Sequence, residues 1–136
     1  MSIINRLQVQ MRTKKESGEA GFSLVELLVV VLIIGILSSI AIPIFLNQQN
    51  QAKDAAAKSD LATAKVAMLS YAIDNSSSFV NASLATLTTY GYVGTTGVTL
   101  LVKTATTTTF CIQATSAANN VFKVSDTTGV TAGACP

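Results

Sequence analysis

The hydrophobic pattern changes along the chain, and each change indicates a different kind of structure. From Leu27 through Leu46 the chain has no charged residue and almost every side chain is apolar. At about 1.5 Å per residue, a helix over this range is about 30 Å long, the thickness of a membrane's hydrocarbon core. The pattern therefore predicts a membrane-inserted helix.

Beyond this segment the chain turns polar but has neither Gly nor Pro, so we expect the helix to continue to about Asn75. Asp54 precedes Lys58 by about one turn, an orientation that modestly favours helix. One apolar stripe recurs at i, i+4, i+7 and i+11, and we expect it to pack on the rest of the protein as core. The stripe consists of Ala62, Val66, Leu69 and Ile73.

From Val98 onward the apolar residues alternate with polar ones, which predicts three or four antiparallel strands. The segment 83–87 is expected to form one short helical turn before them. The expected fold class is α+β: a long N-terminal helix, hydrophobic in front and amphipathic behind, packed on a small 3–4 stranded antiparallel sheet. The rows expected to face the helix are Val98, Leu100 and Val102, then Phe110, Ile112 and Ala114, then Phe122 and Val124.

Glu26 is unusual at the front of the apolar run, because a carboxylate in a membrane span costs on the order of 3 kcal/mol unless it is neutralised or paired. Cutting the chain between Gly21 and Phe22 would create an α-amino group nearby to pair with it. A secretory signal peptide has the opposite geometry, with its apolar core upstream of the cleavage site. Here the apolar segment would stay in the processed protein.

These residues, Gly21, Phe22 and Glu26 followed by the run from Leu27 to Leu46, closely resemble the signal of type IV prepilins and related pseudopilins. The resemblance implies that a leader is removed after Gly21 and that the Phe22 amine is then methylated. It also implies that the retained helix is first a membrane anchor and later the core of a filament. The expected parts are the leader (1–21), the long helix (22–75, with 22–46 in membrane or filament core) and a globular αβ-loop and sheet (76–136).

The charge of the chain is concentrated in the expected leader. The formal net charge is +2, and residues 1–21 account for it with four basic and two acidic side chains. By the positive-inside tendency this segment stays cytoplasmic, and the remainder faces outward. In residues 22–136 five lysines balance five acidic residues. We therefore expect no strong nucleic-acid binding, which depends on Lys and Arg against phosphate.

Pro43 interrupts the uniform apolar run. Proline removes a backbone donor, and membrane helices tolerate it where neighbouring groups satisfy the backbone again. We expect a helix kink or a loosened turn there. In one interpretation this kink has no further role. The resemblance implies another, in which a loosened helix helps the subunit adapt to filament packing.

Cys111 and Cys135 are the chain's two cysteines, and both lie in the part expected outside the cell, where a disulfide is favoured. A bridge closing a loop of about 25 residues would contribute roughly 3 to 4 kcal/mol in the chain-entropy model. Two unpaired thiols are the alternative. Because Cys111 alternates with Phe110 and Ile112, it should point away from the helix, with the tail crossing the outer sheet face. Many pilins close a C-terminal loop in this way, so the resemblance adds support.

The residue inventory argues against catalysis and against a cofactor. The chain has no histidine, no Gly-rich phosphate loop and no nucleophile followed by a nearby base. Two cysteines without histidine do not make a plausible ligand set for a metal. We expect a protein that is not an enzyme and that needs no cofactor.

The expected function is that of a structural subunit of a type IV pilus, a surface filament for adhesion, motility or DNA uptake. Glu26 of an incoming subunit would pair with the Phe22 amine of a neighbour and select the register. Besides other pilin subunits, the resemblance implies as partners a prepilin peptidase that also methylates, an assembly ATPase and membrane platform proteins. The prepilin would be a single-pass membrane protein, and the polymer an extracellular pilus.

Two other functions are compatible with the sequence. A type II secretion pseudopilin shares every N-terminal feature, and the segment 71–75 is also similar to the helix end of major pseudopilins. Major pseudopilins typically have an acidic calcium-binding loop near the C terminus, whereas Asp126 is the one acidic residue after Asp74 here. The cysteine pair is more typical of a pilus subunit. The second alternative is a monomeric surface-anchored binding module in which Glu26 is incidental.

Overall fold

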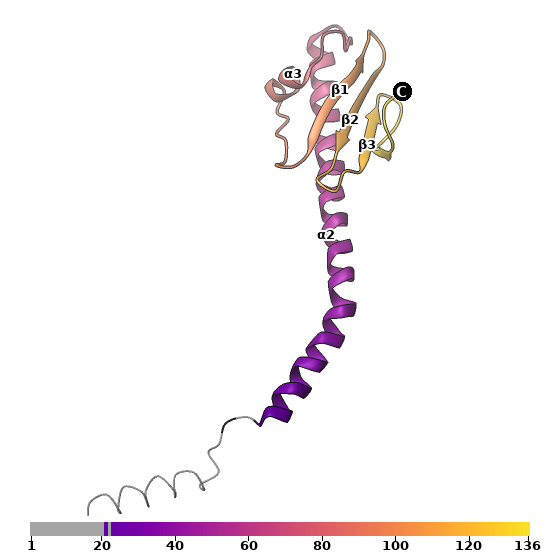
Figure 1. Ribbon diagram of the computed structural model, residues 1–136. Helices are drawn as coiled ribbons and strands as arrows, with labels where there is room; N and C mark the ends of the chain where they lie inside the picture. The colour runs from indigo at the N-terminus through magenta and orange to yellow at the C-terminus, as the bar shows by residue number, and fades with distance from the viewer. Residues whose placement is uncertain (1–20, 22) are drawn as a thin grey trace, which may run out of the picture. The chain divides into compact units, whose positions relative to one another are not determined.

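The computed structural model describes residue 21 and residues 23–136, which group into two compact units that divide after Ile44. Phe22 and residues 1–20 of the expected leader lie outside the described residues. Figure 1 shows a long helix, a short helix and a sheet. Their bounds are α2 (Leu24–Asp74), α3 (Leu84–Thr89), β1 (Thr99–Ala105), β2 (Phe110–Thr115), β3 (Val121–Ser125) and β4 (Thr131–Ala132).

In the first unit, α2 exposes its apolar side chains on every side. From Leu24 to Ile44 all residues are exposed except Ser38, which is half-buried. Ser39 Oγ donates a hydrogen bond of 2.7 Å to the carbonyl oxygen of Ile36, so its hydroxyl is satisfied within the helix. The helix continues through Pro43 without interruption, and the expected kink there stays a prediction.

In the second unit, which begins at Phe45, one face of α2 is buried. Its buried positions recur every three or four residues, as expected for a helix that packs along one side. Most of them are alanines, and Leu61 and Met68 are the large apolar side chains among them. The buried residues of α2 are Ala57, Asp60, Leu61, Ala64, Ala67, Met68 and Ala72.

The apolar stripe expected to form the core lies on the other side of α2, so that prediction is wrong. Val66 is 64% exposed, Leu69 43% and Ile73 79%, and Ala62 is exposed as well. The rear half of α2 has two apolar faces, and helical spacing alone does not say which of them is covered. The face with Leu61 and Met68 is buried, and the face with Val66 and Ile73 is left exposed.

The sheet has four antiparallel strands in the order β1-β2-β3-β4, which confirms the predicted α+β fold. The register of β1 against β2 shifts between Val102 and Thr104, so an irregularity at Lys103 bends the edge strand. The period-two rows do face the core. Leu100, Phe110, Ile112, Ala114, Phe122 and Val124 are buried in it, and Val98 and Val102 are half-buried against it.

The connection between α2 and the sheet contains the expected short helix. Ser83 caps α3, where its hydroxyl accepts from the Thr86 amide while the Thr86 side chain bonds back to the Ser83 amide. The predicted turn over 83–87 is confirmed, and it extends to Thr89. Leu87 is fully buried, and the Phe79 ring meets the Phe110 ring edge-on at 4.8 Å between centroids. The connection therefore contributes side chains to the same core.

Candidate functional site

Ser23 and Glu26 form reciprocal hydrogen bonds where α2 begins. The Ser23 amide donates to Glu26 Oε2 at 3.3 Å, and the Glu26 amide donates to Ser23 Oγ at 3.2 Å. This is a capping box, which satisfies two backbone donors that a helix start otherwise leaves without partners. Gly21 is exposed just before it, and Phe22 lies outside the described residues.

The capping box changes the interpretation of Glu26. The amino end of a helix has a partial positive charge, which stabilises a carboxylate in the first turn. Glu26 therefore has a local partner within its own chain, in addition to the α-amino group expected from cleavage. Ser23 was not predicted as part of this site. The signal that could have found it is the Ser-x-x-Glu spacing directly before an apolar run.

The carboxylates on the rear half of α2 fasten the loops of the second unit to the helix. Buried Asp60 accepts two hydrogen bonds of 2.8 Å, from the amide and from the hydroxyl of Thr95. Asp54 accepts from Ser116 Oγ at 2.6 Å and from Asn120 Nδ2 at 2.8 Å. Asp54 thus holds the turn between β2 and β3.

Two tyrosines near carboxylates of α2 have raised pKa values. Burial raises the pKa of Tyr92, and the negative charge of Asp60 and a hydrogen bond to it raise that pKa further. A hydrogen bond to Asp74 raises the pKa of Tyr90. Both shifts favour the protonated phenol beside a carboxylate of α2.

Two lysines of α2 are also directed toward the sheet and its loops. Lys58 Nζ lies 5.0 Å from the centroid of the Phe122 ring, and Lys65 Nζ donates to the Thr128 carbonyl oxygen at 2.9 Å. Lys58 is thus placed over an aromatic ring, a favourable position for an ammonium group. The charges on this stretch of helix serve contacts inside the second unit.

The structure joins Cys111 and Cys135 in a disulfide, with 6.0 Å between their Cα atoms. Cys111 is buried but does not belong to the core cluster, and Phe110 and Ile112 on either side of it do. The Cys135 amide donates to Gln113 Oε1 at 3.1 Å. The tail thus lies on the outer face of β2, as the sequence predicted.

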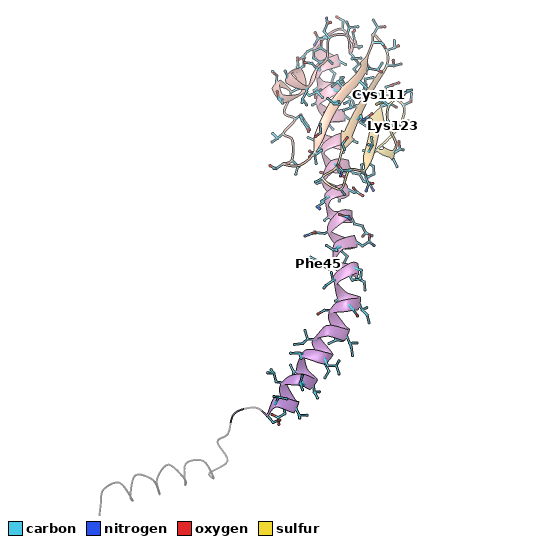
Figure 2. The ribbon with its side chains drawn as sticks, viewed as in Figure 1. Phe45, Cys111 and Lys123 are labelled. Atoms are coloured by element: carbon cyan, nitrogen blue, oxygen red, sulfur yellow. A yellow bond between two sulfur atoms is a disulfide. The ribbon has the colours of Figure 1, made fainter. Side chains whose placement is uncertain are left out.

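The strand β4 holds the same tail at the sheet edge. Its Thr131 and Ala132 pair with Lys123 and Phe122 of β3, and the Gly133 amide donates to the Val121 carbonyl oxygen at 2.9 Å. Figure 2 shows Cys111 and Lys123 on the sheet, and Phe45 on a part of α2 that the sheet does not cover.

The front of the chain has recognisable relatives. Residues 17–42 match the family described as prokaryotic N-terminal methylation motif. The chain is also similar to type II secretion system core protein G of Pseudomonas aeruginosa, at 39% identity over 57 residues, 42% of this chain and 40% of that protein. The protein of the same name from Vibrio cholerae is 38% identical over 63 residues, 46% of this chain and 43% of the relative.

The matched motif contains Gly21, Phe22 and Glu26 and the front of α2, and the fold behind it is a long helix on an antiparallel sheet. In this motif and this fold the chain resembles type IV pilin-like proteins. The two matches span less than half of the curated relatives' length.

Among its described residues the chain has one helix that is long and apolar enough to cross a membrane. That helix and the methylation motif together indicate membrane anchoring. Within residues 21 and 23–136, no group of three or more His, Cys, Asp and Glu side chains is placed to hold a metal ion. Cleavage after Gly21, methylation at Phe22 and the pairing of Glu26 between subunits stay predictions.

Proposed function

We propose that this pilin-like chain is a structural subunit of a type IV pilus, processed after Gly21 and polymerised through its N-terminal helix into a surface filament. The observation that carries the proposal is the overlap of a methylation motif with a helix whose apolar side chains are exposed on all sides. A helix that is hydrophobic all round is stable when it is buried in a membrane or among other helices. Processing at the methylation motif would allow the helix to leave the membrane and pack among the helices of other subunits.

In this proposal Glu26 has two successive partners. Before assembly its carboxylate accepts from the Ser23 amide of its own chain. On assembly it pairs with the methylated Phe22 amine of a neighbouring subunit. Breaking a buried ion pair is costly, so the pair disfavours axial positions that leave either charge alone. It sets the register, and apolar burial between helices supplies the cohesion.

The partners of the proposal are other pilin subunits, a prepilin peptidase that also methylates, an assembly ATPase and membrane platform proteins. The precursor spans the membrane once with residues 1–21 on the cytoplasmic side, and the assembled subunit lies in an extracellular pilus. The chain has no enzymatic role and needs no cofactor in this account.

A second candidate function is that of a type II secretion pseudopilin. The observation in its favour is that both relatives are named as core protein G of such a system. The disulfide that ties the C-terminal tail to β2 supports the pilus subunit instead, because pilins often close a C-terminal loop in this way.

A deletion strain separates the two candidates. The strain is complemented with the native chain, and two properties are measured: surface filaments labelled by an antibody to residues 76–136, and the set of proteins in the culture medium. A pilus subunit restores labelled filaments and leaves the secreted proteins unchanged. Restored secretion without surface filaments at native expression would contradict the pilus assignment and favour the pseudopilin.

A further inference from the structure

A pocket of about 300 Å³ lies on the outer face of the sheet, beside the disulfide. Cys111 of β2 lines this pocket, and its disulfide partner Cys135 does not. Thr104 of β1 and Ser125 of β3 flank Cys111 in the sheet register, and both line the pocket as well. Small-molecule sites in proteins usually have volumes of about 300 to 1,000 Å³. The pocket therefore admits a small molecule to one end of the disulfide.

The C-terminal tail and the pocket reach Cys111 from different directions. The Cys135 amide donates to Gln113 Oε1 at 3.1 Å, so the tail approaches Cys111 from the Gln113 end of β2. The pocket extends past Cys111 toward the other end of the strand, where Thr109 precedes β2, and Pro136 of the tail forms one of its walls. A thiolate that breaks a disulfide attacks one sulfur and displaces the other. The pocket offers Cys111, and not Cys135, to such an attack.

Two charged side chains, Lys123 and Asp126, line the same pocket. Asp126 is fixed within the chain, because its Oδ1 accepts a hydrogen bond of 3.3 Å from the Phe110 amide. Lys123 is half-buried on β3, and Figure 2 shows it on the sheet with Cys111. An ammonium group binds carboxylates as a point charge, and partial burial reduces the screening of that attraction by salt. Lys123 thus favours a ligand with a carboxylate.

We propose that this pocket is a site of thiol–disulfide exchange, at which a small thiol with a carboxylate, such as cysteine, becomes attached to Cys111. The thiolate forms a bond to Cys111 Sγ while the bond between Cys111 and Cys135 breaks. The electron pair leaves on Cys135 Sγ, which then takes a proton from water. The incoming sulfur is oxidised and Cys135 is reduced, so no other reactant is needed. Lys123 binds the carboxylate of the thiol during the attack.

The exchange unfastens the end of the tail but leaves the tail at the sheet. Thr131 of β4 still pairs with Lys123 of β3, and the Gly133 amide still donates to the Val121 carbonyl oxygen. The Cys135 thiol therefore stays near Cys111 at a high effective concentration and can expel the attached thiol again. The modification is thus reversible, and its extent follows the concentration of the thiol. Because it concerns the second unit alone, it does not depend on filament assembly.

The site of attachment is tested on the oxidised native chain in detergent. The protein is treated with L-cysteine, quenched at early times with excess N-ethylmaleimide and digested for peptide mass spectrometry. We expect the added cysteine on Cys111 and N-ethylmaleimide on Cys135. The reverse labelling, or an even mixture of the two, would overturn the proposal. The absence of any cysteine adduct at thiol concentrations at which dithiothreitol reduces the disulfide would overturn it as well.

Lys123 and Lys103 provide a matched pair for the role of charge, since both are lysines of the sheet and Lys103 does not line the pocket. Initial exchange rates are measured with mercaptoacetate, which is anionic, and with 2-mercaptoethanol, which is neutral. Lys123→Met should lower the ratio of the anionic to the neutral rate about threefold to fivefold, the effect of one partly screened charge pair. Lys103→Met should change this ratio by less than about 1.5-fold.

The ratio of two rates cancels any general loosening of the tail, because loosening would speed both reactions. Lys123→Arg retains the charge and should restore most of the native ratio. All three variants should keep the near-ultraviolet circular dichroism of the tyrosines, which lie in the second unit. If Lys123→Met leaves the ratio unchanged, or lowers it no more than Lys103→Met does, the proposal is wrong.

Discussion

The front of α2, residues 24–44, and its rear, residues 45–74, satisfy the need to bury apolar surface in different ways. In the rear, Leu61 and Met68 are fully buried with the sheet's side chains, and Asp60 is bonded to the loop that contains Thr95. In the front, the apolar side chains are exposed on all sides. The rear is completed by its own chain, and the front requires a membrane or other subunits.

Because of this difference, we expect the rear of α2 to determine the folding of the monomer and the front to determine assembly. Substitutions on the buried face of the rear should affect the stability of the monomer. Substitutions in the front should affect assembly and leave the monomer folded. The three tyrosines of the chain all lie in the second unit, so their near-ultraviolet circular dichroism reports the unfolding of that unit.

The largest expected contrast is between a buried and an exposed leucine of α2. Leu61→Ala should lower the free energy of unfolding by about 2 to 5 kcal/mol, because Leu61 is 0% exposed and its removal leaves a cavity. Leu69→Ala, at a site that is 43% exposed, should cost less than about 1 kcal/mol. Urea unfolding of the processed chain in detergent measures both. Equal losses would mean that the exposed face around Leu69 packs within the monomer.

The disulfide should have the next largest effect. Replacing both Cys111 and Cys135 by Ser releases a tail bridged across a sequence separation of 24. In the chain-entropy model the loss is about 3 to 4 kcal/mol. The same urea titration measures it, and reduction of the native chain with dithiothreitol should give the same shift. If neither treatment changes the midpoint, then β4 and the Gln113 contact alone suffice to hold the tail.

The hydrogen bonds of Asp60 should contribute less. Asp60→Asn keeps the shape but removes the negative charge that accepts from the Thr95 amide and hydroxyl, so about 1 to 3 kcal/mol should be lost. Asp74→Asn is the control, because its carboxylate is exposed at the end of α2 and surface substitutions usually change stability by about 0.5 kcal/mol or less. If Asp74→Asn lowers the free energy of unfolding as much as Asp60→Asn, then the burial of Asp60 does not explain its contribution to stability.

The smallest change in free energy is expected at Glu26, at the start of α2. Two variants distinguish its two proposed partners, the Ser23 amide of its own chain and the Phe22 amine of a neighbouring subunit. Glu26→Gln keeps an acceptor for the Ser23 amide but removes the charge that pairs with a neighbour's amine. Filament yield should fall about tenfold, the equivalent of about 1.4 kcal/mol. Ser23→Ala removes the cap hydroxyl and keeps the charge. If Ser23→Ala has the larger effect on yield, then the capping box matters more for assembly than the charge.

Much of the fold was predictable because its patterns are local. The long helix was expected to end near Asn75 and ends at Asp74, where a run of polar residues follows. Ser76 and Ser77 there adopt positive φ angles of 57° and 61°, which helix continuation forbids. The strands were predictable from the alternation around Ile112 and Phe122.

What the sequence did not reveal depends on which of two similar surfaces is covered. Val66, Leu69 and Ile73 have the spacing of a core stripe, yet the sheet packs on the alanine-rich face around Ala64 and Ala67. Helical periodicity identifies faces, and the choice between them depends on how the side chains of each face fit those of the sheet. The role of Asp60 was equally hidden, since its partner Thr95 is 35 positions away in the chain.

The central claim is that the chain is cut after Gly21 and enters a surface filament through the helix that remains. The most direct test is the intact mass and N-terminal fragmentation of the protein in filaments sheared from its native host. The account predicts a chain that begins at N-methylated Phe22 and is two hydrogens lighter than its reduced form because of the Cys111–Cys135 disulfide. A chain that retains Met1 to Gly21, or one that is missing from the sheared filaments, would contradict it.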